Sequence, residues 1–198
     1  MVKDRAIILK TLKQGESNLI VHCLTRSGSR LSLMAKGALK SRRRFGGGVL
    51  EPLNYVQLAY KESSKRSEDQ DLLHWLEEAQ ILEDFAPLRR DYDRLELGFY
   101  FLQVVSKISR EGNLDNNEVF DLLGNALSSL QETSQLTLLR VLFELKLLFQ
   151  QGVLSSEVEG YHLLKYPLQN HGEIKIDDGD LQIIKREVHH LLESYLHA

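Results

Sequence analysis

Short strand-like runs fill most of residues 1–83, and most of the turns between them are too short to hold a crossover helix. The runs cover residues 2–11, 17–25, 30–36 and 48–61, and all are rich in alternating or β-branched residues. Parallel strands need a crossover of a dozen or more residues, so strands joined by short turns pair antiparallel. The pattern therefore predicts a small antiparallel barrel at the N-terminal end.

A further run, residues 71–82, has features of both a helix and a strand. Its Leu, Glu and Ala content is typical of helices, but His74 and Leu76 also alternate with Trp75 and Glu77. We interpret it as a strand, because a fifth strand completes an OB-fold, a five-stranded barrel that binds single-stranded nucleic acids. We therefore predict an OB-fold domain over residues 1–84.

Glycine-containing turns separate the first three strands. Gly15 lies in the turn at 13–16, and Gly28 lies in the turn at 26–29, where it can supply a positive φ. Pro52 is expected at the start or edge of the fourth strand. The polar stretch 62–70 has no periodicity and is predicted to be a loop.

The second part of the chain has the periodicity of helices. Apolar residues recur at helical spacing over 89–109, 116–131, 133–150 and 180–197, so we predict an all-helical domain over residues 85–198 and an α+β fold overall. The third helix is apolar nearly all round and should be the domain's centre. Gly112-Asn113 and Gly152 should end helices, Asp180 should cap the last one, and residues 172–178 suggest a short strand.

A basic, glycine-rich segment interrupts the barrel pattern between the third and fourth strands. Lys40, Arg42, Arg43 and Arg44 are followed by Phe45 and by the glycines 46–48. Arg and Lys donate to phosphates, glycines let a backbone approach closely, and an exposed ring can stack on a base. The segment therefore predicts a nucleic-acid interface with little sequence specificity, because no base-reading helix is evident.

The predicted interface combines the basic run with further basic side chains of the same domain, and Phe45 is the best-placed residue for stacking. The phosphate-binding candidates are Lys10, Lys13, Arg26, Arg30, Lys36, Lys40, Arg42, Arg43 and Arg44. Tyr55, Tyr60 and Trp75 fit either stacking or the core, and for Trp75 we favour the core.

The two halves of the chain carry opposite charge. Residues 1–66 hold 14 Lys and Arg against 4 acidic residues, a net of +10, whereas the rest of the chain has a net of −13. This asymmetry favours a basic module that binds a polyanion, joined to an acidic body. A protein-interaction scaffold whose basic module docks on an acidic partner is the alternative. An anionic membrane surface would fit less well, because no basic amphipathic helix is present.

The residues offer no support for an enzyme or a metal protein. Gly46–Gly48 lack the Lys-Ser/Thr that follows in a phosphate-binding loop, and His189-His190 lack the i, i+4 spacing of a helical metal site. Cys23 is the single cysteine and is expected to be a buried strand residue. We therefore expect no catalytic residues, no metal, no cofactor, no membrane span and a cytoplasmic, nucleoid-associated protein.

Several segments together resemble the bacterial RecO family of recombination mediators. They are AIILKTLKQGESNLIVHCLT (6–25), GSRLSLMAKGALKSRRRFGGGVLEPL (28–53), EAQILEDFAPLRRDYDRL (78–95) and, more faintly, FELKLL (143–148). The resemblance implies an N-terminal OB-fold and a C-terminal helical domain. It also implies binding to single- and double-stranded DNA, strand annealing, contact with single-stranded DNA-binding protein, and help from RecR in loading RecA.

The sequence departs from the family pattern in three places. Residues 152–167 contain no cysteine, so the zinc motif of many members is not expected here. The chain ends near Tyr195 without the family's basic tail, which suggests a truncated C-terminus. In many family members an Arg lies two residues before Phe-Glu-Leu, but this chain has Val141 at that position. Arg140 lies one residue earlier, a rotation of about 100° around a helix, so we do not expect it to bind a partner's acidic tail.

Overall fold

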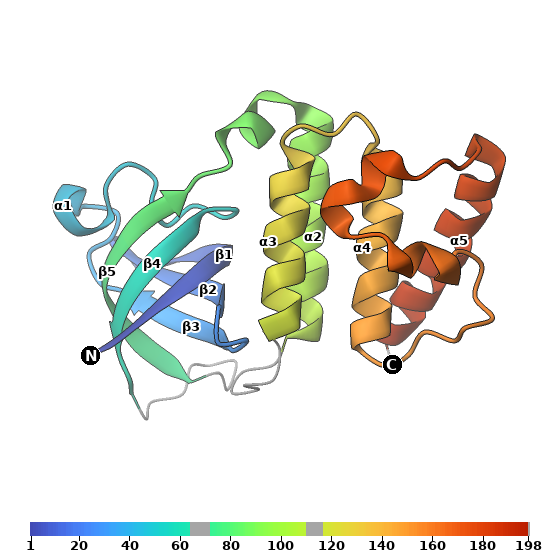
Figure 1. The fold of residues 1–198 in the computed structure, drawn as a ribbon. Helices are drawn as coiled ribbons and strands as arrows, with labels where there is room; N and C mark the ends of the chain where they lie inside the picture. Colours follow the sequence, from blue (N-terminus) through green and yellow to red (C-terminus); the bar gives the residue numbers. More distant parts are fainter. Residues whose placement is uncertain (64–71, 110–116, 198) are drawn as a thin grey trace. The chain divides into compact units, whose positions relative to one another are not determined.

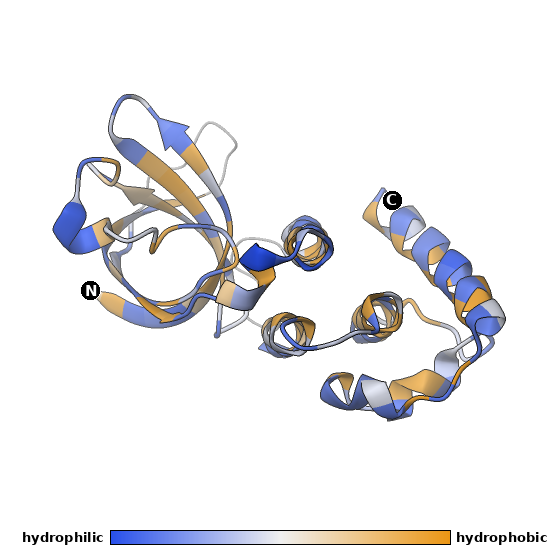
Figure 2. Cartoon of the chain, turned by 90° about the horizontal axis from the view of Figure 1, so that it is seen from above, coloured by the Kyte–Doolittle hydropathy of each residue, from blue (hydrophilic) through white to orange (hydrophobic). Residues whose placement is uncertain are grey.

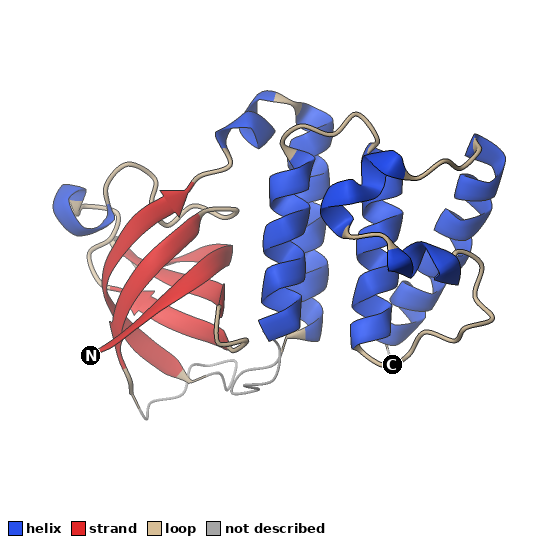
Figure 3. Cartoon of the chain, viewed as in Figure 1, coloured by secondary structure: helices blue, strands red, loops and turns tan. Residues whose placement is uncertain are grey.

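The computed structural model describes residues 1–63, 72–109 and 117–197 (Figures 1 and 3). Residues 1–86 and 105–120 form one compact unit, and residues 87–104 and 121–198 form the other. The first unit contains the strands, and the second contains most of the helical residues.

The first unit is a closed five-stranded barrel, which confirms the predicted OB-fold. The strands are β1 (Val2–Gln14), β2 (Asn18–Thr25), β3 (Arg30–Ala35), β4 (Tyr55–Lys61) and β5 (Leu73–Glu83). Their order around the barrel is β1-β2-β3-β5-β4, and β1 closes the ring by pairing antiparallel with both β2 and β4. Among the described strands, β3 and β5 are the pair that runs parallel. The run predicted at 71–82 is indeed a strand, with bounds Leu73–Glu83.

Alternate residues of the strands fill the barrel interior, as a period of two requires. Figure 2 shows apolar and hydrophilic residues interspersed along the strands. Cys23 is fully buried in this interior, as predicted, and burial raises the pKa of its thiol to about 12. The interior cluster consists of Ala6, Ile8, Val21, Cys23, Leu31, Leu33, Ala35, Ala38, Phe45, Val49, Leu50, Val56, Leu58, Tyr60 and Leu76.

Two predicted turns are confirmed, and the predicted start of β4 is wrong. Gly15 and Gly28 adopt φ of 63° and 90° in the turns on either side of β2. Residues 48–54 are not extended, because Gly48 and Leu53 also have positive φ, so β4 begins only at Tyr55 and Pro52 lies in the preceding turn. The Asn54 side chain holds this turn by donating to the Gly48 carbonyl at 2.9 Å.

The helices lie close to the predicted ranges. They are α2 (Tyr92–Ile108), α3 (Asn117–Leu130), α4 (Leu136–Gln150) and α5 (Asp178–Leu196), with 3-10 turns at Ala86–Arg90, Tyr161–Lys165 and Leu168–Glu173. Helix α4 is the most deeply buried, which confirms its central place in the helical unit. Gly152, with φ of 70°, follows the end of α4 as expected.

Two predictions near the C-terminal helix are wrong, and two predictions elsewhere in the chain fall mostly outside the described residues. Residues 172–178 form no strand, because a 3-10 turn continues to Glu173 and α5 begins at Asp178. The N-cap of α5 is Asp177, whose carboxylate accepts from the Asp180 backbone N–H at 3.0 Å. Gly112-Asn113 and most of the stretch 62–70 lie outside the described residues.

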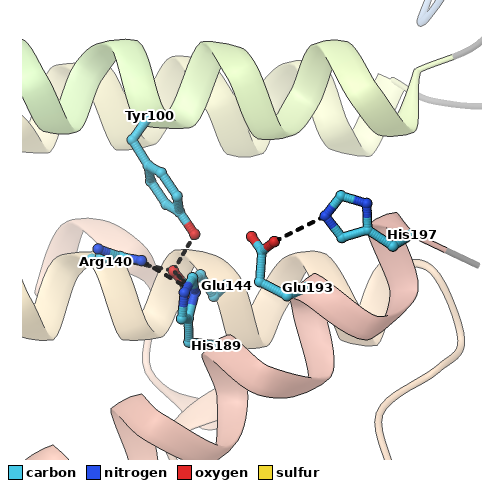
Figure 4. Close-up of polar contacts among 6 residues, drawn as sticks. All are labelled: Tyr100, Arg140, Glu144, His189, Glu193 and His197. Carbon is cyan, nitrogen blue, oxygen red and sulfur yellow. Dashed lines mark hydrogen bonds and ion pairs between the residues drawn. The ribbon is translucent and has the colours of Figure 1, made fainter.

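A buried carboxylate links helices of the second unit (Figure 4). Glu144 on α4 is fully buried, and its Oε1 accepts from the Tyr100 hydroxyl at 2.5 Å and from Arg140 Nε at 2.8 Å. The Arg140 guanidinium also lies 4.1 Å from the centre of the Tyr100 ring, and it contacts His189 Nδ1 at 3.2 Å. The network thus joins α2, α4 and α5, and it engages Arg140 in an internal ion pair.

The hydroxyl of Tyr100 is held as a neutral donor. Burial, and then the neighbouring Glu144 charge, raise the pKa of Tyr100 well above its ordinary value. Because a buried carboxylate is costly to leave unpaired, this hydrogen bond should contribute to the stability of the helical unit.

Replacing Tyr100 with phenylalanine should lower the free energy of unfolding by about 1.5–3 kcal/mol, because one buried hydrogen bond to a charged acceptor is lost without changing the ring. Urea denaturation followed by circular dichroism measures the change. The matched control is Tyr92→Phe, since Tyr92 is 77% exposed and should change stability by less than about 0.5 kcal/mol. Equal effects of the two changes would contradict a stabilising role for the network.

Candidate nucleic-acid interface

The basic segment is fixed to one end of the barrel by backbone hydrogen bonds. After β3 the chain turns at Gly37, where φ is 66°, and the Gly37 N–H donates to Asn18 Oδ1 at 2.9 Å. The Leu39 N–H then donates to the Ser17 carbonyl at 3.0 Å. Both acceptors belong to the β1–β2 hairpin, so the segment is held against that hairpin.

The arginines of the basic, glycine-rich segment lie on a single helical turn. This turn, α1 (Arg42–Phe45), is capped by Ser41, whose hydroxyl accepts from the Arg44 N–H at 3.2 Å. The Arg44 side chain donates to the Lys36 carbonyl at 3.0 Å and so ties the turn back to the end of β3. Figure 2 shows the turn as a strongly hydrophilic projection beside the barrel.

The arginines of α1 are exposed, and Phe45 is not. Arg42, Arg43 and Arg44 all face solvent, as does Lys40 before them. Phe45 is 6% exposed and belongs to the interior cluster of the barrel. The expectation that Phe45 stacks on a base is therefore wrong, because its ring packs inward and anchors α1 to the core.

The remaining candidates divide between two ends of the barrel. Lys13 pairs with Leu19, which pairs with Ala35, so Lys13 lies at the end that carries Lys36 and α1. Lys10 is exposed further along β1, opposite His22. Lys10, Lys13, Lys36, Lys40 and the α1 arginines thus extend from one barrel end onto its wall.

Arg26 and Arg30 lie at the other end of β3. A strand advances about 3.3 Å per residue, so Arg30 is roughly 16 Å along the strand from Ala35. Arg26 is exposed in the β2–β3 turn. Arg30 is half-buried, and its Nη1 donates to the Ser106 carbonyl at 3.3 Å, so it has a structural role within the first unit.

The prediction that Trp75 is a core residue is wrong. It is half-buried and lies outside the interior cluster, with Lys36 Nζ 4.0 Å from the centre of its ring. The alternation of β5 carried the signal, because Leu76 is in the interior and its neighbour Trp75 must face outward. Tyr60, by contrast, is a core residue. The ring of Tyr55 packs beside that of Phe120, with 6.0 Å between the ring centroids.

Within residues 1–63, 72–109 and 117–197, no three His, Cys, Asp or Glu side chains gather as metal ligands would. None of the helices in the same ranges is both long enough and apolar enough to span a bilayer.

Two family models match this chain. The N-terminal model of recombination protein O matches residues 1–85, and the C-terminal model of the same protein matches residues 89–156. The two matches meet between the barrel and the helical residues, and the first includes every candidate of the basic interface.

Curated relatives carry the same family name. The chain is 35% identical over 154 residues to DNA repair protein RecO of Syntrophobacter fumaroxidans, covering 78% of this chain and 58% of that protein. It is 36% identical over 144 residues to the Syntrophus aciditrophicus protein of the same name, covering 73% and 53%. The chain thus spans somewhat more than half the length of these relatives. Together with the family models, these similarities show that the chain belongs to the RecO family of DNA repair proteins.

Proposed function

We propose that this chain is a DNA-binding recombination mediator and strand-annealing protein that catalyses no chemical reaction. The observation that carries the proposal is the basic segment 36–44, held on one end of a barrel with the fold and family of RecO. Contacts from such a segment to phosphates are independent of base sequence. Annealing of arbitrary complementary strands requires that independence.

The proposed DNA contacts follow the geometry of the barrel end. Exposed side chains on the segment and on the adjoining β1 would neutralise phosphates, with Arg26 as a more distant contact. The set at the barrel end is Lys10, Lys13, Lys36, Lys40, Arg42, Arg43 and Arg44. Four to six neutralised phosphates on a single strand would give a log–log salt slope of roughly −3 to −4.

The helical unit is the better candidate for contacts with proteins. Residues 85–198 hold 11 Lys and Arg against 17 acidic residues, a net charge of −6, which disfavours a phosphate backbone. We infer that the partners include single-stranded DNA-binding protein on coated strands and RecR, with which the protein would help load RecA. The substrates would be single- and double-stranded DNA.

The experiment that tests the proposal measures annealing of two complementary oligonucleotides, naked or coated with single-stranded DNA-binding protein. We expect the protein to accelerate annealing in both cases at moderate salt. Accelerated annealing of naked strands alone would support the DNA site and contradict the contact with single-stranded DNA-binding protein. Failure with both, without DNA binding, would contradict the proposal and favour a scaffold that docks on an acidic protein.

Replacing Arg42, Arg43 and Arg44 together with alanine should weaken binding to all DNA sequences. Because each phosphate contact on a single strand contributes about 0.7 to the log–log salt slope, losing three should flatten the slope by about 2. Fluorescence anisotropy of a labelled oligonucleotide over a salt series measures both effects.

The matched control removes the same charge from the helical unit. Lys165, Lys175 and Arg186 are exposed, and their triple alanine variant should leave the salt slope unchanged. If the α1 variant also kept the wild-type slope, its arginines would not be phosphate contacts.

A further inference from the structure

An apolar row crosses the outer wall of the barrel. Leu12 of β1 pairs with Ile20 of β2, Ile20 with Met34 of β3, and Met34 with Trp75 of β5. Their sequence neighbours Val21, Leu33 and Leu76 are in the interior cluster, so by strand alternation the row faces outward.

The row is only partly covered. Leu12 is 37% exposed, and Ile20 and Trp75 are half-buried, whereas Met34 is 9% exposed beneath its neighbours. Apolar side chains aligned on an outer wall, instead of the polar residues that usually alternate with a core, mark a surface with a binding role. In OB-folds the surface of β2 and β3 and the adjoining loops are the usual ligand-binding region.

Cationic side chains flank the Trp75 end of this row. Lys36 lies over the indole, and Lys61 is opposite Trp75 in the β4–β5 register. The Lys61 ammonium is 2.9 Å from Glu77 Oε1, and this bond lowers the pKa of Glu77, so the two charges balance each other. The Lys36 ammonium, by contrast, rests on the face of an aromatic ring, which at an exposed site is a weak interaction.

The position of Lys36 connects the indole to the basic segment. Its ammonium lies over the indole of Trp75, and its carbonyl accepts from the Arg44 side chain, so Lys36 contacts both the indole and α1. If a base of an extended DNA strand lay on the indole, the adjoining phosphates would lie close to Lys36 and Arg44. Apolar contact for bases and cations for phosphates are the two components of single-strand sites.

We propose that Trp75 is a base-stacking residue for single-stranded DNA, and that an incoming base displaces Lys36 from the indole toward the neighbouring phosphate. The inference rests on the proposed DNA-binding function and adds a preference for single strands. Bases within a duplex already stack on both faces, so they cannot cover the indole without being unstacked.

The test uses the fact that the chain contains one tryptophan. Fluorescence excited at the long-wavelength edge of the tryptophan band, where the seven tyrosines absorb little, therefore reports on Trp75 alone, in the wild-type chain and without a label. Titration with an oligothymidylate should quench the emission, and a duplex of the same length at equal bound fraction should change it far less. Anisotropy of labelled DNA gives the bound fraction independently.

Variants distinguish stacking from a structural role. Trp75→Leu should weaken single-strand binding about 5- to 100-fold, the range found when a stacking aromatic is removed, with a much smaller effect on duplex binding. Trp75→Phe should restore most of the affinity, because it keeps a ring face. Leu82→Ala is the control, since Leu82 is an exposed apolar residue on the same strand and should have no effect.

The results separate this inference from the function on which it rests. If DNA binds while the emission stays unchanged, or if Trp75→Leu binds single strands as tightly as wild type does, stacking is overturned and the DNA site stands. If the wild-type protein binds no DNA by anisotropy, the proposed function itself fails and the inference fails with it. Quenching by single strands, together with rescue by Trp75→Phe, supports the inference.

Discussion

Closure of the barrel through β1 is the constraint on which the candidate interface depends. Residues Val2–Ile7 of this strand pair with β4, and residues Ala6–Gln14 pair with β2, with a register shift between Ile8 and Lys10. An irregularity of this kind bends a strand and increases its twist, which allows β1 to pair with β4 along its first part and with β2 along its second. The closed ring leaves no unpaired strand edge among the five strands, and the loops that connect the strands lie at the two ends of the barrel.

The barrel end is stabilised from inside by the same segment that exposes the charges outside. Phe45 and Ala38 pack into the interior cluster, while the cations between them face solvent. Burying one aromatic ring contributes on the order of 2–3 kcal/mol, and this offsets part of the cost of placing four basic side chains close together. The loop after α1 is held similarly, because Leu53 and Asn54 exchange backbone hydrogen bonds with Ile8 at 3.0 Å. A rigid display of this kind costs less entropy on binding than a flexible loop would.

Phe45 and Trp75 exchange the roles that their sequence contexts suggested. Phe45 follows a basic run and precedes three glycines, a context typical of an exposed loop, yet it is buried. Trp75 lies in a run of leucines, a context typical of a core, yet Lys36 covers its outward face. Local composition predicts average burial, but it does not specify the direction of a particular side chain.

The sequence by itself determined the elements and the distribution of charge. Period-two alternation, the glycines at 15 and 28, and the helical spacing of apolar residues depend on local sterics, and they are sufficient to predict four strands and the main helices. The fifth strand has an ambiguous local pattern and is predicted only because it completes the barrel. The separation of a basic from an acidic part is likewise a property of the chain alone. Only the tertiary structure decided which cations share a surface, because strand register places Lys13 beside the end of β3 and Arg30 at the opposite end. Alternation places Trp75 and Leu76 on opposite faces of β5, but only the tertiary structure decided which face is buried, because that depends on the long-range pairing of β5 with β3.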